Sequence, residues 1–275
     1  MIFLGVILGV ISRLLDGAGG NSAASIFLAS IFAFAMLPLP RPAGHAASAF
    51  PLDGPLWSLT YEFLSNILYG LFAKYLTTRI CLILLAPLIV ALFFISYLLG
   101  GMNYGIDWGL GSVLAIVRVL CPFLIGLVIY RLLDTSKFKT NLFQYIVPIA
   151  FLAVLILPIA DARLYAPIVI CTVFPAIIVI SAKCRDEGPL KKVFSWLGNL
   201  SYPIYALNQP VFRLLSVLAG ALGIKPGLVF AAISFVICVV IAHIVLMVYD
   251  GPVRAFLTTK FGRPRTLAPA PERAG

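Results

Sequence analysis

Charged side chains are scarce in this sequence. Of its 275 residues, 11% are charged, ten are acidic and two are histidines. A soluble domain of this length carries roughly a quarter charged residues. The shortage of charge excludes a protein whose surface faces water over most of its area.

Motifs that hold metals and nucleotides are missing as well. The five cysteines stand singly, mostly within apolar stretches, and none belongs to a C-x-x-C pair. The sequence has no zinc-ligand spacing, no phosphate-cradling glycine loop and no interleaved basic-aromatic stretch. We therefore expect small packing cysteines without a disulfide, no metal, no bound cofactor and no nucleic-acid partner.

Long apolar segments fill the chain instead. The sequence is 62% hydrophobic, its mean hydropathy is +1.08, and apolar stretches long enough to cross a bilayer as helices recur throughout. The second segment is short and ends at "LPLPRP", which indicates a partial span, and Pro203 and Pro210 predict a kinked or broken helix in the eighth. The sequence predicts an all-α polytopic membrane bundle of about eight or nine spans, with segments at 2–15, 25–40, 56–75, 80–100, 112–132, 142–160, 164–182, 194–222 and 226–249.

The net charge of +10 is concentrated in a few short loops and the C-terminal stretch. This distribution is the one that the positive-inside rule predicts for cytoplasmic loops. We expect loops 133–141 and 183–193 and the C-terminus to lie in the cytoplasm, and loops 41–55 and 101–111 to lie outside. The protein is then a multi-pass component of a bacterial inner membrane.

The same interpretation divides the chain into a membrane domain, residues 1–258, and a disordered cytoplasmic tail, residues 259–275. If all nine segments cross the membrane one after another, counting back from the cytoplasmic C-terminus places the N-terminus outside. Residue 1 already lies within an apolar helix, without a basic leader.

An acidic residue lies inside the third segment, in "PLDGPLWSLTYEFLSNILYG" at 51–70. An ionisable side chain within a span is costly unless it faces a partner or a wet cavity. On a helix, Glu62 shares one stripe with Ser58, Asn66 and Tyr69, with Trp57 and Tyr61 beside it. The stripe indicates a helix that lines a cavity, where Glu62 acts as a general base or orients a cation. A structural ion pair with an arginine of another span fits these residues equally well.

Arg118, in "AIVRVLCPFLIG", is the second candidate. It is suited to receive the negative charge of a substrate or to pair with Glu62. The alternative is that its side chain snorkels to the nearby interface.

A third polar group surrounds the two prolines of "WLGNLSYPIYALNQPVFRLL" at 196–215. Tyr202, Tyr205 and Asn208 either contribute to a binding site or satisfy the carbonyls that the prolines leave free. The histidines are weaker candidates. We expect His243 to be buried and hydrogen-bonded and His45 to be solvated in an external loop.

Four stretches resemble, in order, the motifs of the membrane acyltransferase 3 family, whose members O-acetylate polysaccharides and other extracytoplasmic acceptors. "PLDGPLWSLTYEF" resembles the family's N-G-P-x-W-S-L-x-x-E signature, the most specific of the four. "VRVLCPFLIGLVIYRL" resembles its arginine-bearing span, and "LGNLSYPIYALNQPV" resembles its LG-x-x-SY-x-x-Y-x-x-H-x-P segment. "VYDGPVRAF" is similar to its closing E-x-P-x-R turn. The resemblance covers about residues 1 to 258.

This resemblance implies a reaction and the residues that perform it. The protein would move an acyl group, acetyl in the typical case, from acyl-CoA on the cytoplasmic side to a hydroxyl of a carbohydrate-like acceptor outside. Membrane lipid and that acceptor are the expected partners, and acyl-CoA is the donor substrate. Glu62 is then the catalytic residue, and the expected substrate-binding residues are Trp57, Ser58, Tyr61, Asn66, Arg118, Tyr202, Tyr205 and Asn208.

The sequence departs from the family pattern in two places. Family members begin with a span that carries an arginine and, about one helix further on, a catalytic histidine, but residues 1–15 correspond to the family's third span. The histidine usual in the "SYxxYxxH" segment is Asn208 here, and an amide cannot exchange a proton near neutral pH. We therefore expect the chain to lack the family's N-terminal spans and, as written, to acylate only at background. Adding an N-terminal segment that bears the histidine should restore transfer.

Two other classes of function remain open. A small-solute transporter or exporter would use Glu62 and Arg118 as intramembrane charges without covalent chemistry. An inactive remnant would serve only as a membrane scaffold. An in-frame extension upstream of Met1 that encodes the missing span would favour the enzyme over the remnant.

Overall fold

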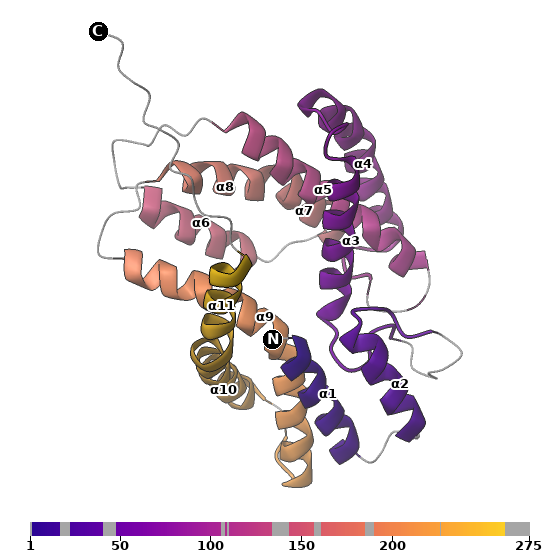
Figure 1. Ribbon diagram of the computed structural model, residues 1–275, viewed down its shortest axis with the longest axis vertical. Coiled ribbons are helices and arrows are strands. Elements are labelled where there is room, and N and C mark those ends of the chain that lie inside the picture. The colour runs from indigo at the N-terminus through magenta and orange to yellow at the C-terminus, as the bar shows by residue number, and fades with distance from the viewer. Residues whose placement is uncertain are drawn as a thin grey trace.

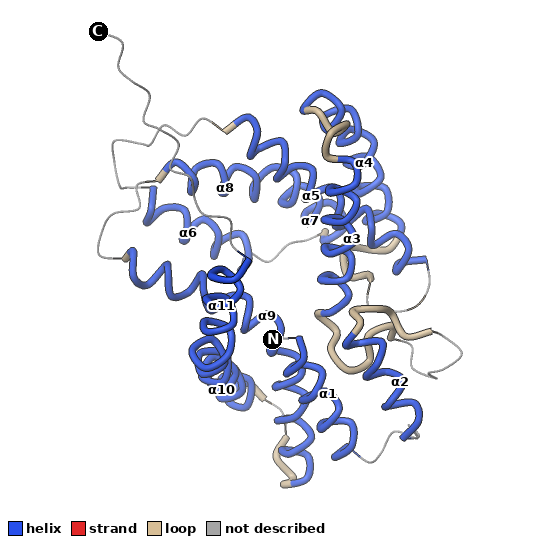
Figure 2. Tube along the Cα trace, viewed as in Figure 1, coloured by secondary structure: helices blue, strands red, loops and turns tan. Residues whose placement is uncertain are grey.

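The computed structural model describes residues 2–16, 23–40, 48–105, 108, 110–133, 143–156, 161–184, 190–225 and 227–261. All regular elements of these residues are helices (Figure 1, Figure 2), which confirms the predicted all-α class. They are α1 (Ile2–Asp16), α2 (Ala23–Phe34), α3 (Leu56–Phe72), α4 (Thr78–Leu98), α5 (Leu110–Leu132), α6 (Phe143–Ile156), α7 (Ala162–Ile168), η2 (Val169–Val173), α8 (Phe174–Lys183), α9 (Lys191–Ala221), α10 (Leu228–Val245), η3 (Leu246–Asp250) and α11 (Gly251–Phe261).

Each predicted apolar segment contains one of these helices or a continuous run of them. The eighth segment is one helix, α9, whose ribbon changes direction along its length (Figure 1), as two internal prolines predict. The ninth was predicted to end at 249, but α10 continues through η3 and α11 to Phe261. Residues 259–261 of the predicted tail are therefore helical, and residues 262–275 lie outside the described part of the chain, as does His45.

Four described helical stretches are long and apolar enough to cross a membrane: Thr78–Leu98, Gly111–Leu132, Arg163–Lys183 and Leu228–Phe261. Two shorter apolar helices, Ala23–Phe34 and Tyr145–Ile156, fall below that length. Most large apolar side chains on these helices are exposed, as is usual for surfaces that face lipid. The chain is a membrane protein with several spans, and the count of eight or nine stays a prediction.

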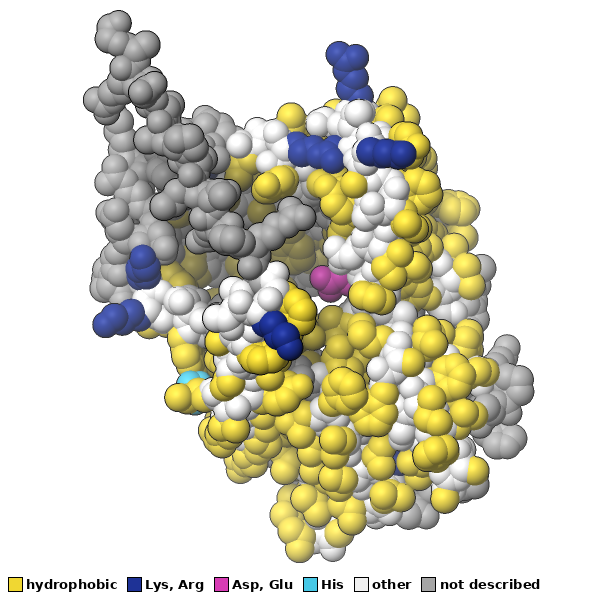
Figure 3. Space-filling view, in the orientation of Figure 1, with side chains coloured by type: hydrophobic (Ala, Val, Ile, Leu, Met, Phe, Trp, Pro, Cys, Tyr) yellow, Lys and Arg dark blue, Asp and Glu magenta, His cyan; other side chains and the backbone are white. Residues whose placement is uncertain are grey.

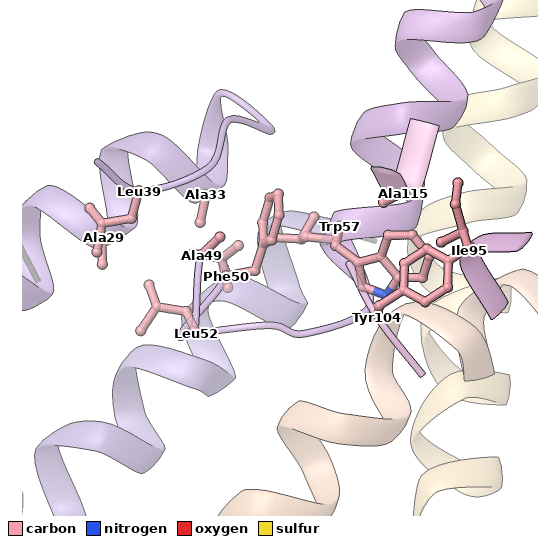
Figure 4. Close-up of a cluster of buried hydrophobic side chains, with 12 residues drawn as sticks. Ala29, Ala33, Leu39, Ala49, Phe50, Leu52, Trp57, Ile95, Tyr104 and Ala115 are labelled. Carbon is pink, nitrogen blue, oxygen red and sulfur yellow. The ribbon is translucent and has the colours of Figure 1, made fainter. Parts of the chain in front are cut away.

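Two groups of packed helices make up the molecule. In one group α4 packs beside α5, α3 packs along α5, and α7 packs on α4. In the other, α9 packs between α1 and α10. Figure 1 shows the first group at the upper right and the second below it. The segment 48–55 joins the two groups through a buried apolar cluster that includes Phe50, Leu52 and Trp57 (Figure 4).

Two glycines allow α1 to pack closely against its neighbours. A Cβ atom on Gly5 would lie 2.8 Å from the carbonyl oxygen of Ala206 in α9, and one on Gly9 would overlap the carbonyl oxygen of Leu52. Small residues one turn apart are typical of close helix contacts in membranes. The two glycines allow segment 48–55 to lie in the contact region between α1 and α9, which we call the α9 seam.

The contacts of α1 also fix its direction. Gly5 lies beside Ala206, while Arg13 and Arg213 both donate hydrogen bonds to the carbonyl oxygen of Pro51, at 3.2 and 2.7 Å. α1 therefore runs parallel to the C-terminal half of α9. Counting all nine segments as spans gave these two helices opposite directions, which disagrees with this packing. The two agree if the second segment is a partial span, the alternative that its short length already indicated, because α2 has 12 residues.

Candidate active site

The segment that carries the "WSLxxE" motif folds as a turn that becomes α3. The backbone N–H groups of Leu56, Trp57 and Ser58 donate to the carbonyl oxygens of Asp53, Gly54 and Pro55, at 3.2, 3.1 and 3.2 Å. Pro55 precedes the helix, where a missing N–H costs nothing. This turn sets where α3 begins and therefore where the side chains of Trp57, Ser58 and Glu62 lie.

A cavity of about 420 Å³ lies between α3, α5 and α9. It brings together five predicted site residues from three separate stretches of sequence. Its lining consists of Trp57, Ser58, Glu62, Arg118, Val119, Pro122, Phe123 and Tyr205. In the space-filling view an acidic side chain is visible in a hollow near the centre of the face shown (Figure 3).

The carboxylate of Glu62 stands free in this cavity. It forms no ion pair or hydrogen bond with the residues that the structure describes, and its side chain is exposed. Arg118 lines the same cavity but does not pair with it. Among the described residues, the structural ion pair that the sequence left as an equal alternative is therefore not formed.

Arg118 is held by aromatic rings and a backbone carbonyl. Its Nη1 donates to the carbonyl oxygen of Tyr104 at 2.6 Å, and its Cζ lies 4.6 Å from the ring centre of Trp57 and 5.5 Å from that of Tyr104. The two rings lie side by side at one end of the buried cluster (Figure 4). Ring faces attract a guanidinium without neutralising it. Arg118 therefore presents a positioned positive charge to the cavity rather than snorkelling to an interface.

Two hydroxyl groups complete the polar wall. The hydroxyls of Ser58 and Tyr205 are hydrogen-bonded to each other, and both also approach the carbonyl oxygen of Pro55, at 3.2 and 3.3 Å. This pair joins α3 to α9 at the edge of the cavity. Because these hydrogen bonds use both hydroxyl protons, the pair offers oxygen lone pairs that accept hydrogen bonds from a ligand that bears hydroxyl groups.

Four predicted binding residues do not line this cavity. Tyr61 donates to the carbonyl oxygen of Ser112 in α5, and Asn66 donates to the backbone carbonyl oxygen of Glu62 at 2.9 Å. Tyr202 lies within electrostatic reach of Glu62 and Asp250. Asn208 is exposed on α9. Their predicted roles in binding stay predictions.

Sequence reasoning named Tyr205 as a binding residue but missed that it holds the motif segment in place together with two further residues of α9. Tyr205, Gln209 and Arg213 follow one another at one-turn spacing on α9, and all three bind backbone groups of residues 51–55. Gly54 N–H donates to Gln209 Oε1 at 2.5 Å, while Tyr205 and Arg213 donate to the carbonyl oxygens of Pro55 and Pro51. The i, i+4, i+8 spacing was visible in the sequence, but the partner backbone was not. We call these three residues the α9 clamp.

Asp53 is a second carboxyl that the sequence did not single out. Its side chain is 1% exposed and its Oδ1 has no hydrogen-bond partner. Burial raises the pKa of Asp53 to about 7. The family signature has asparagine at this position, so this chain carries a titratable group where the pattern has a neutral amide.

His243, the histidine within the described residues, and the buried cysteines have packing roles. Trp196 Nε1 donates to Nδ1 of His243 at 3.3 Å, and the two rings pack edge to face between α9 and α10. His243 is hydrogen-bonded as expected, although it is partly exposed rather than buried. Cys81, Cys121 and Cys238 are buried thiols. Within the described residues no group of three or more His, Cys, Asp or Glu side chains is placed to hold a metal ion.

Comparison with known proteins bears directly on the four motif-like stretches. A sequence model of the acyltransferase 3 domain family, described as an acyltransferase domain, matches residues 1–249. No curated protein sequence and no solved structure gives a significant match to the chain. The family match covers most of the chain and includes the motif segment, the cavity and the α9 clamp. The chain therefore belongs to the acyltransferase 3 family of membrane acyltransferases.

Proposed function

We propose that this protein is an O-acyltransferase that uses Glu62 as its catalytic base. In this proposal it moves an acetyl group from acyl-CoA on the cytoplasmic side to a hydroxyl of a carbohydrate-like acceptor outside. The observation that carries the proposal is the cavity in which an unpaired Glu62 carboxylate, the Arg118 cation and the Ser58–Tyr205 hydroxyl pair meet. The family match supports the reaction class.

We assign a step to each group. Glu62 takes the proton of the acceptor hydroxyl, whose oxygen attacks the thioester carbonyl carbon. The C–S bond then breaks and CoA leaves as the thiolate. Arg118 stabilises the negative charge that develops on the carbonyl oxygen, a role worth about 10²–10³-fold in rate for one positioned donor. Ser58 and Tyr205 orient the acceptor through hydrogen bonds.

The setting of the reaction belongs to the same proposal. Loops 133–141 and 183–193 and the C-terminus would face the cytoplasm of a bacterium, where the donor is. The bundle would have about eight spans once α2 is left out of the count. Trp57 lines the cavity, and its ring holds the Arg118 guanidinium in place there.

The test is the substitution Glu62→Gln. Glutamine keeps the size and the hydrogen-bonding capacity but loses the basicity. In the chain with the family's N-terminal segment supplied in cis, we therefore expect acyl transfer to fall by about 10²–10⁴-fold while membrane abundance stays unchanged. Transfer of a radiolabelled acetyl group to extracytoplasmic carbohydrate is measured in membranes that contain this extended chain, and membranes with the chain alone give the background.

Asp161→Asn is the matched control, because Asp161 has the same charge but caps α7. If E62Q in the extended chain transfers as well as the extended chain without the substitution, Glu62 is not the base. If E62Q disappears from the membrane while D161N accumulates, Glu62 is a structural residue.

A transporter would use the same two charges, since Glu62 and Arg118 also suit the binding of a small solute. The two functions differ in covalent chemistry. An acyltransferase leaves labelled acetyl on the acceptor and free CoA in the medium. A transporter moves solute into vesicles without consuming acyl-CoA.

A further inference from the structure

A second cavity, of about 700 Å³, lies between α3, α4 and α5. We call it the α3–α5 groove. Its walls are almost entirely apolar, and the hydroxyl of Ser65 in the wall is already donated to the carbonyl oxygen of Tyr61 at 2.8 Å. The groove is lined by Ser65, Leu68, Tyr69, Phe72, Tyr75, Leu76, Ile80, Leu84, Pro87, Leu88, Ala91, Leu120, Phe123 and Leu124.

One end of the groove touches the candidate active site. Phe123 lines both cavities, and its ring packs edge to face against Tyr69 with ring centres 6.1 Å apart. Whatever fills the groove therefore lies against the back of a side chain that forms the wall of the polar cavity.

The other end carries positive charge. The Nζ atom of Lys74 lies 4.6 Å from the ring centre of Tyr75, and Arg131 donates to the carbonyl oxygen of Leu76. Arg79 is exposed in the first turn of α4. Figure 3 shows basic side chains gathered over the upper ends of α3 and α4. Within the described residues none of these three cations pairs with a carboxylate.

The length of the groove matches one leaflet of a bilayer. Along α4 the lining runs from Ile80 to Ala91, a rise of about 16 Å at 1.5 Å per residue. The hydrocarbon core is about 30 Å thick, so one leaflet contributes about half of that. The groove is an apolar slot of leaflet depth with cations at its mouth.

We propose that the α3–α5 groove binds an acyl chain of an anionic phospholipid, whose phosphate lies against Lys74, Arg79 and the N-terminus of α4. The bound chain supports Phe123 from behind and closes the wall of the active-site cavity. This proposal does not depend on the reaction assigned to Glu62.

The alternative occupant of a slot that ends at the active site is the pantetheine arm of CoA. That arm has two amide groups, and burying an amide without a hydrogen-bond partner is costly. The apolar walls therefore favour a hydrocarbon chain. A long acyl chain of a CoA donor fails for another reason, because with its phosphates at Lys74 the thioester would stay at the mouth of the groove.

The first test fills the groove. Ala91→Phe places a ring in it, and Val90→Phe is the control, because Val90 is the next residue and is 69% exposed. The full chain is purified from membranes, stripped of loose lipid and analysed by native mass spectrometry. We expect the unmodified chain and V90F to retain one anionic phospholipid per chain. The fraction of A91F that retains this lipid should be at least tenfold lower. Equal retention by A91F would overturn the proposal, since the lipid would then be annular only.

The second test changes the cations. Lys74→Gln with Arg79→Gln should lower the preference for phosphatidylglycerol over phosphatidylcholine in mixed nanodiscs by about thirtyfold, given roughly 1 kcal/mol for each of the two basic residues. Both side chains are exposed, so we expect this double variant to fold. It therefore tests the proposal even if A91F fails to accumulate in the membrane. An unchanged preference would overturn the proposal, as would displacement of the bound lipid by free CoA.

Discussion

Two carboxyl groups nine residues apart have opposite environments in this protein. Glu62 is exposed in the cavity, whereas Asp53 is enclosed between α1, α9 and the start of α3. The position of Glu62 in a cavity could be predicted from sequence, because an acid within an apolar helix needs a wet cavity or a partner. The burial of Asp53 could not, because an Asp-Gly pair in a loop ordinarily indicates a solvated turn.

Asp53 should make the stability of the fold depend on pH. The folded protein binds the proton more tightly than the unfolded chain, since the pKa of this carboxyl is raised from 3.8 to about 7. The free energy of unfolding should therefore fall as the pH rises from about 4 to about 7, by at most about 4 kcal/mol. Asp53→Asn should remove this loss and raise the midpoint of thermal unfolding at pH 7 and above.

The measurement is tryptophan fluorescence during heating in detergent, at several pH values between 4 and 8. Asp161→Asn serves again as control, because Asp161 is exposed. If D53N and the unmodified chain show the same pH dependence, the Asp53 carboxyl does not carry a raised pKa.

At the scale of elements, α9 is the helix on which the active site depends. The α9 clamp holds residues 51–55, and that segment sets the position of α3 and hence of Trp57, Ser58 and Glu62. The kink predicted from Pro203 and Pro210 is useful here, because it lets the second half of α9 run along α1 while the first half leaves the seam (Figure 1). The sequence predicted the helix, the prolines and Tyr205, but selected Asn208 instead of its neighbour Gln209.

Gln209 and Asn208 form a matched pair for testing the clamp. Gln209→Leu leaves the buried N–H of Gly54 without its acceptor, which should cost about 1–3 kcal/mol. Asn208→Leu changes an exposed amide that bonds to no described residue, so its effect on unfolding should be within about 0.5 kcal/mol. Urea or thermal unfolding in detergent measures both variants. Equal effects would contradict the clamp.

At the scale of the whole molecule, the lengths of the apolar runs predicted the helices. Apart from the second and ninth segments, the ends of the helices lie close to the predicted ends, because each apolar run stops where polar or proline residues begin. Contacts at both ends of α3 and α5, Tyr61 with Ser112 and Leu76 with Arg131, show that these helices are parallel. This arrangement agrees with basic loops on one side of the membrane.

The direction of α1 was not predictable, because it depends on whether α2 crosses. A 12-residue apolar helix is ambiguous by composition alone, and only the contacts of Gly5 and Arg13 with the α9 seam decide it. Close packing through glycines and a backbone carbonyl leaves no periodic signal in the chain. Five predicted site residues line one cavity, three of them from the "WSLxxE" motif of α3, and their roles in the reaction stay predictions.

The last prediction separates the two topologies. Because α1 is parallel to the C-terminal half of α9, Asp16 should lie on the same side as the loop that follows α9, which we expect outside. In a background without native cysteines, D16C and S48C should both react with a membrane-impermeant maleimide added to intact cells, and S136C, outside the described residues, should react only after permeabilisation. A nine-span chain would put Asp16 in the cytoplasm, because α2 would then cross. Protection of D16C with labelling of S48C would therefore show that α2 spans the membrane and that α1 is not parallel to α9.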